Sequence, residues 1–270
     1  MNEKLAVLGA GNMGEAIIAG MLANGTIEAT QVVCVDQSVA RMQLMADTYG
    51  VRSASAAEAI AFADVVLLAV KPQNVPALME ETGPLFTASQ TVVSIVAGVP
   101  TATYQAGIDA DVAIVRAMPN TPAQLGAGVT AMALADASRT DVLRVANEIF
   151  GSVGSVVTVT EDKLDAVTAV SGSGPAYLFM FAEALVAAGV AEGLDEDTAQ
   201  KLAIHTIYGS GVMLRDSGRL PGELREMVSS PGGTTLAALA SFADHGFHET
   251  VAAAVAAAAR RAQELAAETA

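Results

Sequence analysis

The sequence contains no tryptophan, one cysteine and few aromatic residues, which account for 4% of its 270 residues. Because hydrophobic residues still make up 52%, the core has to consist of aliphatic side chains and methionine, which let helices pack closely. Cys34 has no partner for an intramolecular disulfide, which fits a reducing compartment and predicts a cytoplasmic location. The length allows one large domain and favours two.

Basic residues are also scarce, since 14 lysines and arginines face 29 acids and the formal net charge is −15. This balance argues against a nucleic acid or an anionic membrane as a partner, because both bind basic surfaces. A bound anion must therefore be held locally, by backbone N–H groups and a few placed cations. The sequence has no run of 18 apolar residues, no signal-peptide pattern and no histidines at metal-site spacing. We expect no membrane partner and no metal.

Glycines, by contrast, form a clear pattern near the start of the chain. An apolar strand at residues 4–8 leads into a G-x-G-x-x-G motif and then into an apolar helical segment. In a dinucleotide-binding loop the first glycine allows a tight turn, the second admits the pyrophosphate, and the third lets the helix pack on the strand. The cofactor contacts predicted here are Gly9, Ala10, Gly11, Asn12, Met13 and Gly14.

The other half of that fingerprint is an acid after the next strand. Residues 31–35 predict the strand, and Asp36 follows it, about 20 residues beyond Gly14 as the fingerprint requires. The alternative is a plain strand-turn-helix whose glycines serve packing alone. The context favours a dinucleotide, NADP or NAD, bound with Asp36 at its ribose.

Short apolar runs alternate with helical segments as far as residue 160, a pattern typical of a doubly wound parallel sheet with helices on both faces. Further strands are predicted at residues 64–70, 91–97, 112–117, 128–134 and 155–160, and helices at 39–49 and 140–150. Ligands of such sheets bind beyond the carboxyl ends of the strands. Further cofactor contacts are therefore expected at Ala69, Val70, Lys71, Pro72, Ala97, Gly98 and Asn120. The alternatives are a surface role for Lys71 and a rigid proline-flanked connection at residues 118–122.

From residue 161 onward the β-branched runs give way to helical segments rich in alanine, leucine and methionine. A boundary is therefore predicted near Thr160, between a dinucleotide-binding domain at residues 1–160 and an all-helical domain at 161–270. Helices are predicted at residues 162–170, 175–188, 197–216, 221–228, 235–243 and 248–267. Their apolar faces exceed what one small domain can bury, which predicts self-association.

Two stretches of small residues in this half precede predicted helices. Residues 171–175 (SGSGP) and 229–235 (SSPGGTT) each place hydroxyl groups and glycines before a helix start. Backbone N–H groups in such a geometry can bind an anion. The alternative is ordinary helix capping, which uses the same residue types.

With these stretches, the sequence resembles the pyrroline-5-carboxylate reductase family over nearly its full length. The matching motifs are GAGNMG at residues 9–14, AVKP at 69–72, AMPNTP at 117–122, SGSGPAY at 171–177 and the segment 221–235, which ends in SSPGGTT. The resemblance implies a Rossmann domain followed by a helical dimerisation domain, and a homodimer that can assemble into a homodecamer. It also implies reduction of 1-pyrroline-5-carboxylate to L-proline by NAD(P)H, the last step of proline biosynthesis.

The substrate implied by this resemblance is a cyclic imine with a carboxylate. Its site needs an anion cradle, a hydride donor and a hydrogen-bond donor at the ring nitrogen. By resemblance, Thr235 is that donor, and the backbone of Gly232, Gly233 and Thr234 holds the carboxylate. Glu161 is assigned to the substrate pocket on the same basis, and Ser171 is assigned to it as the first residue of the stretch 171–175. For Glu161 the alternative is an exposed acid at a helix start.

Asp36 also bears on the choice of cofactor. A carboxylate there accepts hydrogen bonds from a ribose 2′-OH and repels a 2′-phosphate, which favours NADH, whereas Arg41 on the next helix is a candidate to bind the phosphate. We expect both cofactors to work, with NADH more competitive than is usual in the family.

Two other functions stay open at this point. A β-hydroxyacid dehydrogenase needs a catalytic lysine within residues 171–188, which contain none. A non-catalytic nucleotide-binding protein is expected to have lost SSPGGTT, which is complete here.

Overall fold

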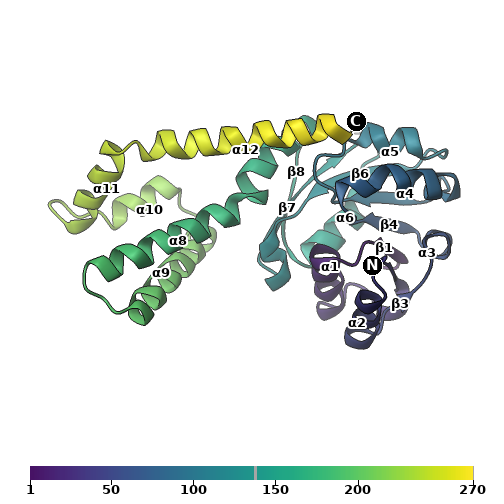
Figure 1. Cartoon of the computed structure of the whole chain (residues 1–270), viewed down its shortest axis with the longest axis horizontal. Coiled ribbons are helices and arrows are strands. Elements are labelled where there is room, and N and C mark those ends of the chain that lie inside the picture. Colours follow the sequence, from purple (N-terminus) through teal and green to yellow (C-terminus); the bar gives the residue numbers. More distant parts are fainter. Residues whose placement is uncertain (137–138, 270) are drawn as a thin grey trace. The chain divides into compact units, whose positions relative to one another are not determined.

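The computed structural model describes residues 1–136 and 139–269, which form two compact units. One unit consists of Met1–Ser173 together with the last turns of the chain from Ala257 onward, and the other of Gly174–Ala256. The first unit is a sheet covered by helices, and the second is made of helices (Figure 1).

Within the described residues, an eight-stranded sheet forms the centre of the first unit, in the order β3-β2-β1-β4-β5-β6-β7-β8. The strands are β1 (Leu5–Leu8), β2 (Val32–Val35), β3 (Arg52–Ser53), β4 (Val65–Leu68), β5 (Thr91–Ser94), β6 (Ala113–Met118), β7 (Gly128–Leu134) and β8 (Gly154–Thr158). The direction of winding reverses between β1 and β4. This switch point places the ligand crevice beyond the carboxyl ends of these two strands.

The doubly wound sheet that the sequence predicts is confirmed, but its last two strands depart from the parallel pattern. Strands β1 to β6 pair in parallel, whereas β7 pairs antiparallel with β6, and β8 pairs parallel with β7. The connection between β6 and β7 contains only a short 3₁₀ segment, Thr121–Leu125. A parallel return requires a crossover of about a dozen residues or more, so the chain has to turn back beside β6.

Helices cover both faces of the sheet. They are α1 (Asn12–Ala23), α2 (Val39–Tyr49), α3 (Ala56–Phe62), α4 (Val75–Thr82), α5 (Thr101–Gly107) and α6 (Asp141–Gly151). Because alternate residues of a strand point to opposite faces, Leu5 and Val7 join one core with α1 and α6. Ala6 and Leu8 join the other core, with α3, α4 and α5. Cys34 is fully buried in β2, and this burial raises the pKa of its thiol to about 12.

The segment that follows β8 differs from its prediction. A 3₁₀ turn at Glu161–Lys163, α7 (Leu164–Val167) and a π-helical turn at Thr168–Gly172 lead almost without interruption into the next helix. The predicted break between two helices at residues 171–174 is therefore wrong. In a regular helix the Ser171 carbonyl would accept a bond from the N–H of residue 175, which a proline lacks. The backbone instead forms a π turn, in which the Ser173 N–H donates to the Thr168 carbonyl.

The second unit contains the helices α8 (Gly174–Ala191), α9 (Glu196–Asp216), α10 (Pro221–Met227), α11 (Thr234–Asp244) and the first part of α12 (Phe247–Thr269). Their bounds lie within a few residues of the predicted ones. Helix α8 is apolar on all sides, yet within the described chain none of its residues is buried. Leu178, Phe179 and Met180 expose more than half of their surface.

By length and composition alone, the helical stretch Glu161–Ala191 is able to cross a membrane, with a mean hydropathy of 1.5 in an 18-residue window of which 6% is buried. The sequence pattern did not single it out, because serines and glycines interrupt its apolar residues. A helix that is apolar all round requires cover, either from lipid or from protein.

Candidate active site

The glycine loop after β1 is shaped by contacts that leave no room for side chains. Gly9 has a φ of +104°, and a Cβ there would lie 2.5 Å from the Ala69 carbonyl oxygen. A Cβ on Gly14 would lie 2.4 Å from the Gly9 carbonyl oxygen, so the third glycine is needed for the helix to pack on the loop. The predicted roles of these two glycines agree with this geometry.

Gly11 lies where a ligand can approach. A Cβ on this residue would meet nothing within 4 Å, so open space faces its backbone. Gly11 is also the N-cap of α1 and supplies no side-chain cap. The first intrahelical bond runs from the Glu15 N–H to the Gly11 carbonyl, at 2.9 Å. The N–H groups of the first turn can therefore bind an anion, and this cradle fits the pyrophosphate of a dinucleotide.

Asp36 lies at the carboxyl end of β2, next to the same loop. Its Oδ2 accepts a hydrogen bond from the Ala10 N–H at 2.9 Å, and its Oδ1 accepts one from the Ser38 N–H, also at 2.9 Å. These bonds fix the carboxylate beside the cradle. Its predicted contact with the ribose stays a prediction.

The other predicted cofactor residues follow neighbouring strands. Ala69, Val70, Lys71 and Pro72 follow β4, and the Ala69 N–H donates to the Leu8 carbonyl across the switch point at 2.8 Å. Lys71 is exposed. Ala97 and Gly98 follow β5, and Gly98 has a φ of +74° and faces Leu265 and Ala266 on α12. The parallel strands thus bring the predicted segments to one edge.

Asn120 lies just after β6, and its side chain already has partners within the first unit. Its amide nitrogen donates to the Ser171 carbonyl at 3.2 Å, and its amide oxygen accepts from the Val129 N–H at 2.9 Å. The Ser171 carbonyl is available because Pro175 has no N–H to bond it. The Ser171 hydroxyl donates to the Val167 carbonyl at 3.1 Å. Asn120 therefore ties the end of β6 to the π turn, and the ligand contacts of both residues stay predictions.

Glu161 lies in a polar cluster with Thr101 and Arg116 near this edge. Its carboxylate accepts from the Thr101 N–H at 2.8 Å and the Thr101 hydroxyl at 2.5 Å, at the start of α5. It also accepts from Arg116 of β6 at 3.2 Å, and the Arg116 side chain is only 9% exposed. Burial alone would raise the pKa of the Glu161 carboxyl, but the Thr101 and Arg116 contacts outweigh it and the pKa is lowered. The carboxylate that the resemblance assigns to substrate thus links the start of α5 to β6.

The pKa of Glu161 predicts a pH dependence. Because the folded pKa lies below the ordinary value of 4.5, the contribution of this carboxylate to stability is complete above that value and is lost as pH falls through the folded pKa. We expect Glu161→Gln to lower the free energy of unfolding at about pH 7 and to narrow its difference from the wild type at about pH 4. Denaturant unfolding at both pH values measures this. Glu81→Gln, at an exposed residue of α4, is the control, and an equal deficit of Glu161→Gln at both pH values would contradict the prediction.

The start of α11 is the corresponding feature of the second unit. Gly232 has a φ of +71°, Gly233 is the N-cap without a side-chain cap, and Thr234 and Thr235 open the helix. A Cβ on Gly233 would lie 2.6 Å from the Ser230 hydroxyl and 3.1 Å from the Ser230 carbonyl oxygen, so a side chain there would displace the Ser230 side chain and crowd the turn. The Thr235 side chain is half-buried, while Thr234 is exposed. The backbone N–H groups in the first turn of α11 have no side-chain cap, so they form a second place where an anion can bind.

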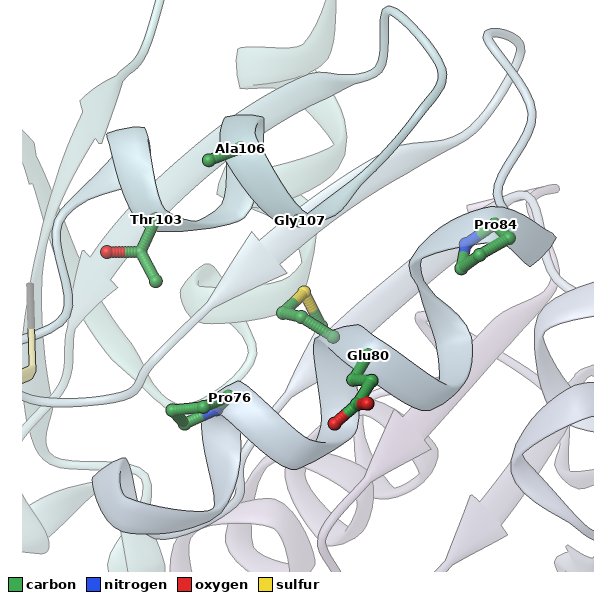
Figure 2. A pocket seen from close by; sticks show the side chains of 7 residues that line it. Pro76, Glu80, Pro84, Thr103, Ala106 and Gly107 are labelled. Carbon is green, nitrogen blue, oxygen red and sulfur yellow. The ribbon is translucent and has the colours of Figure 1, made fainter.

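Two hollows of the first unit differ in character. One, of about 430 Å³, lies between α4 and α5, where Pro76 and Glu80 come from one helix and Thr103 and Ala106 from the other (Figure 2). Its lining has a carboxylate and no cation, which does not fit a phosphate. The other, of about 340 Å³, borders α1 and is lined by polar residues that include Asn12, Glu15 and Tyr49. It adjoins the glycine cradle.

The sequence reading missed Thr101, Arg116, Glu15 and Tyr49. An arginine inside the apolar run of β6 was the one available signal for Arg116, because a buried guanidinium requires an acidic partner. Glu15, in the first turn of α1, was read as part of a helix only.

Comparison with known proteins agrees with this architecture. Residues 161–265 match a family model described as pyrroline-5-carboxylate reductase dimerisation, and residues 4–98 match one described as NADP oxidoreductase coenzyme F420-dependent. A pyrroline-5-carboxylate reductase of Synechocystis sp. is 42% identical over 98% of this chain and 99% of its own length.

Solved structures give the same result. The structure of a pyrroline-5-carboxylate reductase from Coxiella burnetii has a TM-score of 0.92 at 33% identity, covering 98% of this chain and 99% of that one. The pyrroline carboxylate reductase of Plasmodium falciparum, solved with NADP bound, has a TM-score of 0.86 at 29% identity, covering 98% of each chain. This chain therefore belongs to the pyrroline-5-carboxylate reductase family of NAD(P)H-dependent oxidoreductases.

Proposed function

We propose that this chain carries out the family's reaction, reduction of 1-pyrroline-5-carboxylate to L-proline, with the start of α11 as the substrate cradle. The observation that carries this proposal is the start of α11: the Gly233 N–H bonds the Ser230 carbonyl at 3.0 Å, and the N–H groups of the first turn that follows, which includes Thr235, have no intrahelical or side-chain cap. The N–H groups bind the carboxylate, and the hydroxyl donates to the ring nitrogen.

The cofactor is held by the glycine loop and the edge of the sheet beside it. The first turn of α1 binds the pyrophosphate, and Asp36 lies at the ribose. When bound, NAD(P)H supplies a hydride to the imine carbon. The ring nitrogen takes up a proton, and proline and the oxidised cofactor are released. Orientation of the two reactants is the main source of the rate, since alignment can lower a barrier by about 7 to 11 kcal/mol.

The assay that tests this function is oxidation of NADH and NADPH with and without 1-pyrroline-5-carboxylate. We expect oxidation only with the imine, and no activity with hydroxy acids and the oxidised cofactor. Oxidation of a hydroxy acid would indicate a β-hydroxyacid dehydrogenase. Nucleotide binding without turnover would indicate a non-catalytic protein.

The domain division at Thr160 is part of the same proposal. The matched dimerisation model begins at Glu161, and the helical stretch that starts there runs on into α8. We therefore assign cofactor binding to residues 1–160, and substrate binding and self-association to residues 161–270. The buried, unpaired Cys34 supports a reducing, cytoplasmic location for the enzyme.

We also propose that α8 and α9 form the interface of a homodimer, which can assemble further into a homodecamer. Phe179 on α8 is 63% exposed, and Leu202 and Ile204 on α9 are 54% and 50% exposed. An apolar surface of this kind is covered in oligomers. Because the segment belongs to a matched dimerisation region, a second copy of this chain covers it here, and not lipid.

If α8 and α9 form this interface, one negative charge introduced on α8 should disrupt the dimer. Phe179→Asp is expected to convert the dimer to a monomer, because an aspartate cannot be buried unpaired in an apolar interface. Sedimentation velocity measures the oligomeric state. Val39→Asp is the matched control, since Val39 is 84% exposed at the first turn of α2. A Phe179→Asp variant that sediments like the wild type would place the interface elsewhere.

A further inference from the structure

Glu15 and Arg41 form an ion pair beside the cofactor cradle, within the first unit. Arg41 lies in the first turn of α2, and its guanidinium also donates to the Ala10 carbonyl of the glycine loop. Tyr49, at the end of the same helix, donates its hydroxyl to the other oxygen of Glu15 at 2.9 Å. Arg41 and Tyr49 thus bond one oxygen each of the Glu15 carboxylate, and the ion pair fixes the position of Arg41.

The cluster is partly buried and keeps its charges. The side chain of Arg41 is 21% exposed and that of Glu15 is 25% exposed. Burial alone would raise the pKa of the Glu15 carboxyl, but the contacts with Tyr49 and Arg41 outweigh it and the pKa is lowered. The acid is therefore ionised under physiological conditions, and it neutralises Arg41.

This ion pair lies close to the residue that is expected to face the ribose 2′ position, where NADH and NADPH differ. In a dinucleotide fold, the residue after the second strand faces the ribose 2′ position, where NADPH has a phosphate and NADH a hydroxyl. Here that residue is Asp36, whose carboxylate is fixed beside Ala10. An arginine nearby normally compensates a 2′-phosphate. Arg41 lies beside this loop, where its Nε donates to the Ala10 carbonyl and one terminal nitrogen of its guanidinium donates to Glu15.

We infer that Glu15 and Tyr49 are cofactor-selecting residues, which hold Arg41 away from a 2′-phosphate and thereby make NADH the preferred cofactor. Glu15, Arg41 and Asp36 together carry one net negative charge at this place, which repels the phosphate of NADPH and leaves the 2′-hydroxyl of NADH unaffected. The inference rests on the proposed cofactor site. It assigns a role to two residues that lie outside that site.

Equilibrium titration with each reduced cofactor, followed by its fluorescence in the absence of substrate, tests this selection. We expect the wild type to bind NADH more tightly than NADPH. Glu15→Gln keeps the shape of the side chain and a hydrogen-bond acceptor, but it removes the negative charge that neutralises Arg41. It should tighten NADPH binding by about tenfold, the size of one charge-assisted hydrogen bond, and leave NADH binding nearly unchanged.

Further variants separate this role from a structural one. Adding Arg41→Met to Glu15→Gln should abolish the gain for NADPH. Tyr49→Phe, which keeps the ion pair, should shift the ratio in the same direction by less, and it provides the test if Glu15→Gln fails to fold. Glu3→Gln, which breaks the ion pair of Glu3 with Arg144 elsewhere in the unit, is the matched control and should not change the ratio.

Three outcomes would overturn the inference: a wild type that prefers NADPH, an unchanged ratio in Glu15→Gln, or a gain that survives Arg41→Met. Binding of neither cofactor by the folded wild type would overturn it together with the proposed cofactor site. A protein that binds NADH selectively but does not reduce the imine would uphold the selection and contradict the proposed function, so the two failures are distinguishable.

Discussion

Thr235→Val is expected to lower kcat for imine reduction by at least about 100-fold, the lower range for loss of a positioned proton or hydrogen-bond donor. Valine has nearly the shape of threonine, so the second residue of α11 keeps its packing and its backbone N–H. The hydroxyl alone is lost. The KM for 1-pyrroline-5-carboxylate should change little, because the carboxylate is held by backbone. Steady-state kinetics at saturating cofactor measure both quantities.

Two matched variants accompany this prediction. Thr235→Ser keeps a hydroxyl and should recover most of the activity. Thr234→Val removes the neighbouring, exposed hydroxyl and should leave kcat close to the wild-type value. Full activity of Thr235→Val, or an equal loss in Thr234→Val, would remove the Thr235 hydroxyl from the mechanism.

Gly11→Ala is expected to leave the fold intact and weaken binding of both reduced cofactors by about tenfold or more. The new Cβ would meet no atom of the first unit within 4 Å, and Gly11 has an ordinary φ of −68° that alanine adopts without strain. The Tm should therefore change by no more than about 2 °C. The methyl group would instead occupy the space where the pyrophosphate approaches the backbone.

Gly14→Ala provides the contrast for this experiment. Its Cβ would lie 2.4 Å from the Gly9 carbonyl oxygen, so this variant should lower the Tm by several degrees as well as weaken binding. Thermal unfolding and fluorescence titration of the two variants measure these effects. Unchanged cofactor affinity in Gly11→Ala would mean that the pyrophosphate does not bind at the start of α1.

The sequence predicted those helices and strands whose ends and composition are marked by neighbouring residues. The helix at Val39–Tyr49 and the strand at Gly128–Leu134 have the predicted bounds, because Gly50 ends the helix in a left-handed conformation and β-branched residues mark the strand. The strand Arg52–Ser53 is too short to leave a pattern. The helices α3, α4 and α5 were missed because each has eight residues or fewer, about two turns.

The π turn shows a different limit. A run of serine and glycine before Pro175 is typical of a loop. In the structure this run lies between α7 and α8 and continues the helical path as a π turn. The bond from Asn120 to the Ser171 carbonyl helps to hold this conformation, and it joins residues that are far apart in the sequence.

The candidate site was predicted where a motif is contiguous and missed where residues meet through the fold. The glycine loop and the start of α11 are continuous stretches with a geometry of their own. The contacts of Glu161 with Thr101 and Arg116, and of Arg41 with Glu15, depend on which strands are neighbours in the sheet. Arg41 was a candidate partner for a 2′-phosphate, and its ion pair with Glu15 is a contact that the sequence did not predict.

A structure of this enzyme with oxidised cofactor and proline, the two products of the reaction, would show where substrate and cofactor bind. We expect the proline carboxylate on the N–H groups of the first turn of α11, the ring nitrogen beside the Thr235 hydroxyl, and the pyrophosphate at the first turn of α1. Proline bound away from the start of α11, with the cofactor in place, would contradict this expectation.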